Sequence, residues 1–149
     1  MIPFEQLNQQ THEIGELSKV LNVLIEDREI CDTDITCDLF MRYSDKVKKH
    51  LVLQDTNVYG LLLTHSDKKM NAVGSRFVES SREINRIFNA YMRRWCTKTT
   101  HNLAIFNHDM FVKETKDMFH MIAARTQSEV EELYPAARAL ESSQTAKSA

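Results

Sequence analysis

Four long stretches of this chain repeat apolar residues every three or four positions, and almost nothing in the sequence interrupts them. The 149 residues include only 3 Gly and 2 Pro, the two residue types least favourable inside a helix. Apolar residues at this spacing form one face of an α-helix. No stretch shows the strict alternation of apolar and polar residues that is typical of a half-buried strand. The sequence therefore predicts an all-α fold.

The apolar stripes cover residues 7–24, 35–61, 73–95 and 111–133. Turns are expected at 26–34, at 65–67 with Ser66 as the N-cap, and at 97–100. Gly74 is the weak point of the third helix, since glycine costs about 1 kcal/mol relative to alanine there. We expect the fourth helix to end near Pro135.

Four amphipathic helices joined by short turns bury their stripes by packing as antiparallel neighbours. The predicted fold is a single antiparallel up-down-up-down four-helix bundle over residues 1–140. Residues 141–149 are polar, and we expect them to form a disordered tail.

Composition excludes several classes of protein. The formal net charge of −2 gives no electrostatic reason to expect nucleic-acid binding. No apolar run approaches the roughly 20 residues of a membrane span, and the N-terminus does not resemble a secretory signal. A cytoplasmic location is therefore expected. Cys31, Cys37 and Cys96 fit neither a disulfide framework nor a zinc motif, so we expect three reduced thiols.

One level of the predicted bundle is polar rather than apolar. A helical wheel at about 100° per residue places polar side chains on all four inward faces. Residues equally far from a turn lie at one height in an antiparallel pair, and this test puts all of them at mid-bundle. We call this set the polar belt; it consists of Gln10, His50, Gln54, Ser80, Arg125 and Glu129.

Within the polar belt, Arg125 and Glu129 are four residues apart on an inward face and are predicted to form a buried ion pair. Gln10, His50 and Gln54 would supply further hydrogen bonds. The alternative is that the aliphatic stem of Arg125 is buried while its guanidinium group reaches the bundle surface.

Two segments carry a resemblance to a known family. The first runs from His50 and Gln54 to Val58-Tyr59-Gly60, and the second from Arg125 and Glu129 to Leu133-Tyr134-Pro135. Both resemble the repeated motif of the hemerythrin-like, or HHE cation-binding, family. The resemblance covers residues from about 4 to 137. In that family, histidines and carboxylates from four helices hold two iron atoms that bind oxygen or respond to iron and redox state.

The chain departs from the family pattern at the metal ligands. Gln54 stands where the first copy of the motif has Glu, Arg125 where the second has His, and Gln10 where the first helix offers His. The third helix has no His between Asp67 and Trp95. An arginine has a permanent positive charge and no free lone pair, so it repels a cation. The resemblance therefore implies a vacant metal site with no cofactor.

The alternative is a protein that binds two irons, or another cation, and senses oxygen, iron or redox state. His12 lies close in sequence to the position of the family's first histidine ligand, but on the helical wheel it points away from the apolar stripe. A register shift or a π-bulge would turn it inward. The ligands under this alternative would be His12, His50, Asp55, Glu79, Glu83 and Glu129. A weaker alternative is an enzyme with an atypical di-metal centre.

The sequence shows no nucleophile–base pair and no glycine-rich phosphate loop, which argues against an enzyme. We expect a regulatory or protein-interaction role, with a protein partner or a homodimer. Leu51, Leu62 and Leu63 on the outward faces would serve as the contact with a second copy.

Overall fold

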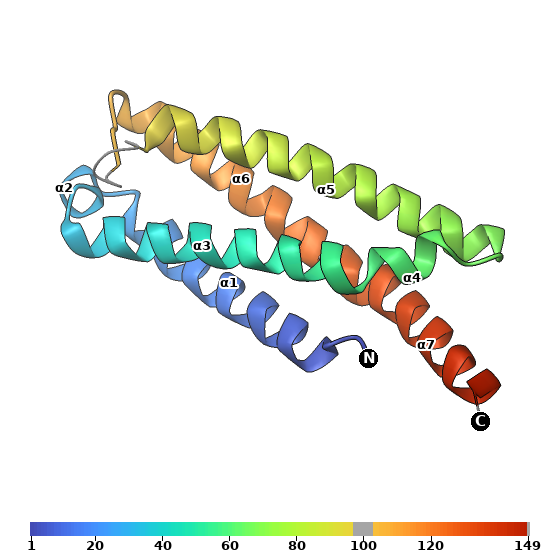
Figure 1. The fold of residues 1–149 in the computed structure, drawn as a ribbon. Coiled ribbons are helices and arrows are strands. Elements are labelled where there is room, and N and C mark those ends of the chain that lie inside the picture. Colours follow the sequence, from blue (N-terminus) through green and yellow to red (C-terminus); the bar gives the residue numbers. More distant parts are fainter. Residues whose placement is uncertain (97–102, 149) are drawn as a thin grey trace.

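The structure, a computed structural model, describes residues 1–96 and 103–148, with side chains as far as residue 143 (Figure 1). The helices are α1 (Phe4–Leu24), α2 (Arg28–Cys31), α3 (Asp34–Asn57), α4 (Tyr59–Leu63), α5 (Lys68–Trp95), α6 (His108–Ser128), the π-helical turn η1 (Glu129–Leu133) and α7 (Tyr134–Ser148). Within these ranges no strand is present, and an isolated bridge joins Cys96 to Leu103. The prediction of an all-α fold is confirmed for this part of the chain. The predicted turn at 97–100 lies outside the described residues.

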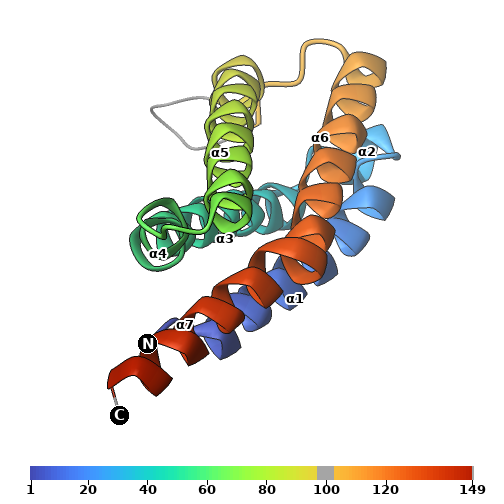
Figure 2. The same cartoon turned by 90° about the vertical axis from the view of Figure 1, so that its right-hand side faces the viewer.

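Successive long helices run in opposite directions (Figure 1). α1 leads from the N-terminus to the end of the molecule that carries α2, which we call the α2 end. α3 leads away from that end, α5 returns to it, and α6 leaves it again. α1 packs against α3 and α6, and α5 packs against α4 and α6. Figure 2 shows that α6, η1 and α7 continue one another as a single long helical rod.

Side-chain caps explain where the helices begin. Thr33 accepts a hydrogen bond from the amide of Thr36 at the start of α3, and Asn107 accepts one from Met110 at the start of α6. Asp67 accepts from the amides of Lys69 and Met70, so it caps α5 in place of the predicted Ser66. Each cap satisfies amides that have no partner inside the helix.

The fourth predicted helix does not end near Pro135. A proline lacks the amide hydrogen and collides with the carbonyl four residues earlier, so a regular helix would stop or kink there. The π-helical turn η1 comes directly before this point and widens the helix. α7 then continues to Ser148. The expected end of this helix was therefore wrong.

Residues 141–148, which were expected to belong to a disordered tail, continue the helix α7; residue 149 lies outside the described residues. Ala137 and Leu140 on α7 are buried. The amide of Ile2 donates a hydrogen bond to Glu141 Oε2 at 2.6 Å, which ties α7 to the N-terminus. These contacts hold the first two turns of α7 against the rest of the fold.

The described core has two hydrophobic clusters. The α2-end cluster contains Ile14, Leu21, Ile25, Cys31, Phe40, Tyr43, Val47, Leu51, Ile84, Phe88, Tyr91, Trp95, Phe111, Met118, Phe119 and Ile122. The opposite cluster contains Ile2, Leu7, Val58, Tyr59, Leu62, Phe77, Leu133, Tyr134, Ala137 and Leu140. Ile35 was expected in the core but is 72% exposed, and Thr36 and Phe40 are buried instead. The second predicted helix is broken at Val58, which separates α3 from α4.

Gly74 allows α4 to approach α5 closely. A Cβ atom at this position would lie 2.8 Å from the Cβ of Leu62. The glycine is therefore required by packing between two helices, although it is unfavourable for the helix itself. Of the three leucines proposed as a dimer contact, Leu51 and Leu62 are buried inside the chain, and Leu63 is 38% exposed.

Over the ranges that the structure describes, no helix combines the length and the apolar character needed to cross a bilayer.

Candidate functional site

A buried polar group lies between the two hydrophobic clusters. His50, Gln54, Arg125 and Glu129 are 2%, 0%, 5% and 0% exposed, respectively. Gln10 is half-buried beside them. They come from α1, α3, α6 and η1, so the group connects helices that are far apart in the sequence.

His50 joins three of these elements. Its Nδ1 lies 2.8 Å from Gln10 Oε1 on α1, and its Nε2 lies 2.9 Å from Glu129 Oε1 on η1. A carboxylate oxygen and an amide oxygen both only accept hydrogen bonds, so each of these contacts needs a proton on the ring nitrogen that faces it. Both ring nitrogens of His50 are thus engaged with side-chain oxygens.

Arg125 distributes its donors over four acceptors. Nε donates to Glu129 Oε2 at 2.8 Å, and Nη1 donates to the backbone carbonyl of Phe77 on α5 at 3.0 Å. Nη2 donates to Gln54 Oε1 at 3.3 Å and to the hydroxyl of Tyr59 at 2.5 Å. The guanidinium carbon also lies 4.8 Å from the centre of the Phe77 ring. Arg125 points into the molecule and does not extend to the surface.

Two tyrosines complete the group in a symmetrical way. Tyr59 follows Gln54 by five residues and donates to its Oε1 at 3.2 Å. Tyr134 follows Glu129 by five residues and donates to its Oε1 at 3.3 Å. The hydroxyl of Tyr134 also accepts from Gln54 Nε2 at 2.9 Å. The segment that contains Gln54 and Tyr59 is therefore hydrogen-bonded to the segment that contains Glu129 and Tyr134.

Irregular helix geometry makes these contacts available. In a regular α-helix, residues five apart point about 140° away from each other. The π-turn η1 spans Glu129–Leu133 and brings Tyr134 above Glu129. On the other segment, the break at Val58 starts a new helix at Tyr59. The irregular turns thus aim both hydroxyls at the centre of the molecule.

We call Gln10, His50, Gln54, Tyr59, Arg125, Glu129 and Tyr134 the central network. Burial by itself would raise the pKa of Glu129, but the hydrogen bond and charge of His50 and the charge of Arg125 outweigh burial, so this pKa lies below the ordinary value of 4.5. Burial raises the pKa of Tyr59 and of Tyr134. The central network therefore contains an ionised carboxylate, a guanidinium and two neutral phenols.

Five of the six residues of the polar belt are brought together in the central network: Gln10, His50, Gln54, Arg125 and Glu129. The sixth, Ser80, is half-buried, whereas its neighbour Ser81 is 7% exposed and lies close to Tyr59. The predicted polar belt contains Ser80, and the structure buries Ser81 more deeply. The two serines are adjacent and lie on either side of the stripe on a helical wheel, so periodicity alone does not separate them.

The alternative ligand set is not assembled. His12, Asp55, Glu79 and Glu83 are all exposed, while His50 and Glu129 are buried. α1 is a regular helix at His12, and the π-turn of this structure lies in a different helix. In the described part of the chain, no group of three or more His, Cys, Asp or Glu side chains is placed to hold a metal ion. Of the alternative set, only His50 and Glu129 are in contact.

Sequence reasoning missed Tyr59 and Tyr134 as members of the site. A signal was present, because each stands five residues after a polar belt residue in the segments that carry the family resemblance. A regular helix would point them elsewhere, so periodicity alone could not assign them. Tyr43 was assigned only to the apolar stripe, yet its hydroxyl is buried and has no hydrogen-bond partner among the described residues.

A cleft reaches the central network from outside. It has a volume of about 640 Å³, lies between α5 and α6, and is lined by Phe77, Ser80, Ile84, Met121 and Arg125 among others. Arg125 forms part of its wall, but its donors are directed inward to the four acceptors. The carboxylate of Glu129 is fully buried, so a molecule in this cleft does not reach it. The hydrogen bonds of the central network connect α1, α3, α5, α6 and η1 to one another.

Comparison with models of known protein families, with curated proteins and with solved structures finds no match for this chain.

Proposed function

We propose that this protein is a non-catalytic, hemerythrin-like four-helix bundle in which Arg125 replaces the charge of a metal centre. We further propose that it acts in the cytoplasm as a regulatory protein that binds another protein. The observation that carries the first part is the position of Arg125, which donates to Glu129, Gln54, Tyr59 and the carbonyl of Phe77 at the centre of the molecule.

The oxygen and nitrogen atoms that could bind a metal ion already have hydrogen-bond partners, which supports this proposal. Glu129 Oε1 interacts with His50 and Tyr134, and Glu129 Oε2 interacts with Arg125. Both nitrogens of His50 are also engaged. A cation at this place would have to displace these contacts and lie beside a guanidinium, whose charge repels it. The same polar positions that carry metal ligands in the resembling family would here form a hydrogen-bonded structural network.

A protein-interaction role is supported by the distribution of exposed apolar side chains. Val20, Val23, Ile30, Ile35, Phe106 and Met110 are exposed and belong to α1, α2, α3, α6 and the segment before α6, which meet at the α2 end (Figure 1). A concentration of exposed apolar residues in one region is typical of an interaction surface.

The proposal that this protein binds no metal can be tested by substitutions that introduce the metal-binding side chains of the hemerythrin-like family. We would express the wild type and the variant Q10H/Q54E/S81H/R125H in iron-supplemented medium and measure iron per chain. A variant with histidines on exposed positions of the same helices, N8H/N89H/Q127H, serves as the control. We expect the wild type and the control to hold well below one iron, and the first variant to hold more.

Two irons per wild-type chain would refute the proposal in favour of a di-iron sensor. If the first variant bound no more iron than the control, the hemerythrin-like arrangement would be wrong, although the buried ion pair would stand.

The interaction role can be tested by photocrosslinking in the expressing cell. A photoreactive amino acid would be placed at Val23 or Ile35 on the α2 end and, as a control, at exposed Gln127 on α6. We expect the same adduct from both positions of the α2 end and none from the control. The absence of a shared adduct would contradict the proposal.

A further inference from the structure

Four sulfur-bearing residues lie on α3 and at the end of α5, near the α2 end of the molecule. Cys37 and Met41 are four residues apart on α3, and Met92 and Cys96 are four residues apart at the end of α5. Residues at this spacing lie one above the other on a helix. The thiol of Cys96 donates to Met92 Sδ, and the two sulfur atoms are 3.8 Å apart.

The register of the two helices places the α3 pair beside the α5 pair. Ser44 Oγ donates to Met92 Sδ at 3.6 Å, which fixes these residues opposite each other. α3 and α5 run in opposite directions (Figure 1). One turn further along α5, Cys96 therefore lies opposite residue 40, between Cys37 and Met41.

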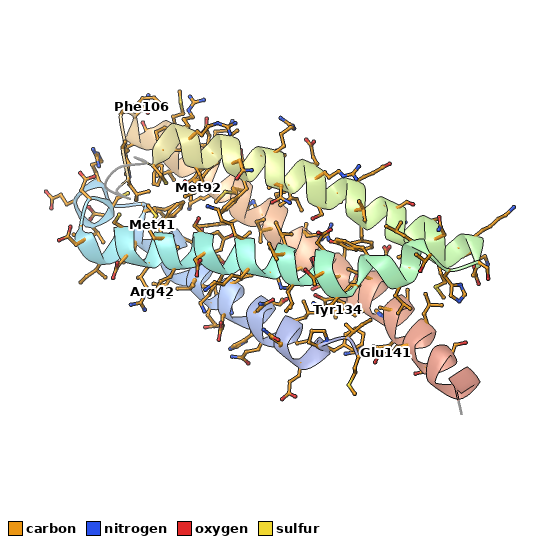
Figure 3. All side chains as sticks on the ribbon, viewed as in Figure 1. Met41, Arg42, Met92, Phe106, Tyr134 and Glu141 are labelled. Atoms are coloured by element: carbon orange, nitrogen blue, oxygen red, sulfur yellow. The ribbon has the colours of Figure 1, made fainter. Side chains whose placement is uncertain are left out.

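Two further observations agree with this placement. Met41, Met92 and Cys96 all pack on the α2-end cluster, and Figure 3 shows Met41 and Met92 at the end of the molecule that also carries Phe106. The Cys37 thiol is close enough to Cys96 to contribute to raising its pKa, although burial is the larger cause.

These side chains are shielded but reachable. Cys37, Met41, Met92 and Cys96 are each half-buried, whereas Cys31 is 1% exposed. Part of each of these four residues is therefore accessible to solvent.

We propose that Cys37, Met41, Met92 and Cys96 form a binding site for a soft monovalent cation, Cu(I). Thiolates and thioethers select Cu(I) over harder ions such as magnesium or calcium. Two sulfur ligands about 2.3 Å from a tetrahedral metal lie about 3.8 Å apart. This is the separation of Cys96 Sγ and Met92 Sδ, 3.8 Å. The α5 pair therefore already has the spacing that two ligands of one ion require.

Binding at this site changes no oxidation state. Each thiol loses its proton to the solvent, two S–H bonds break, and two Cu–S bonds form, while the thioethers donate lone pairs. The site lies away from the central network and does not depend on the function proposed for it.

The test is a titration of reduced, full-length protein with Cu(I) under anaerobic conditions, in competition with the chelator bicinchoninate. We expect one Cu(I) per chain, with affinity lowered at least about 100-fold in C37S and in C96S, and about 10-fold in M92L. C31S removes a thiol outside the site, and M70L removes a thioether near α4. Both controls should bind as the wild type does. Circular dichroism of each variant verifies that it is folded.

X-ray absorption of the copper-loaded protein gives an independent measurement that needs no variant. We expect a shell of sulfur atoms only, at about 2.3 Å. Nitrogen or oxygen ligands in that shell would overturn the proposal. Wild-type binding too weak to compete with the chelator, or unchanged affinity in folded C37S and C96S, would do the same.

Discussion

Replacing Arg125 with leucine tests whether the central network holds the protein together. The guanidinium and Glu129 are 5% and 0% exposed, so their ion pair is screened very little by solvent. In Arg125→Leu, the carboxylate of Glu129 stays buried without its cation, and the carbonyl of Phe77 loses its side-chain donor. Breaking one side of a buried pair typically costs about 3–5 kcal/mol.

That cost is a large share of the total stability of a domain, which is roughly 5–15 kcal/mol. For a chain of this size, each kcal/mol shifts the melting temperature by about 2–4 °C, so the expected drop is roughly 6–20 °C. The double variant R125Q/E129Q removes both charges and leaves amides that can still hydrogen-bond. It should therefore cost clearly less than R125L.

The assay is urea unfolding followed by far-UV circular dichroism, with the slope of the transition compared among variants. The exposed pair Glu83–Arg86 provides a matched control, and E83Q/R86Q should change stability by at most a few tenths of a kcal/mol. If R125L differed from the wild type by less than about 0.5 kcal/mol, the reasoning would be refuted. The same conclusion would follow if R125Q/E129Q cost as much as R125L.

Three further predictions use the same unfolding assay. Gly74→Ala should destabilise the protein because the new methyl group collides with α4. Gly15→Ala, with open space around it, should stabilise the protein by about 0.5–1 kcal/mol. The opposite order of stabilities would contradict the close approach of α4 to α5 at Gly74. Tyr43→Phe should leave stability unchanged or raise it, since its buried hydroxyl has no described partner, while Tyr134→Phe loses hydrogen bonds and should cost about 1 kcal/mol. Because the folded-state pKa of Glu129 lies below its ordinary 4.5, the carboxylate contributes stability above that pH and loses it as the pH falls further. E129Q should therefore show a smaller loss of stability on acidification than the wild type, and an equal loss would argue against a depressed pKa.

The helices and most of the central network could be predicted from the sequence because both depend on local spacing. Apolar residues every three or four positions define a buried face whatever that face packs against, and scarce Gly and Pro leave the helices intact. Heights measured from the turns then placed Gln10, His50, Gln54, Arg125 and Glu129 at one level. These side chains are in hydrogen-bond contact in the structure.

Contacts between distant segments decided the rest, and no local pattern carries them. Which of the adjacent residues Ser80 and Ser81 is the more buried depends on packing between helices. Gly74 is explained only by the approach of Leu62. Leu140 is buried, and Glu141 accepts a hydrogen bond from the amide of Ile2, so the helix that follows Pro135 is joined to the N-terminal segment.

The sequence by itself determined that this chain is helical and predicted five of the polar residues that meet at its centre, because helix periodicity is a property of neighbouring residues. Only the tertiary structure decided that the helix continues through Pro135 and that Tyr134 turns inward. The physical reason is that a π-turn is unfavourable in isolation and forms where buried hydrogen bonds and packing from other helices stabilise it.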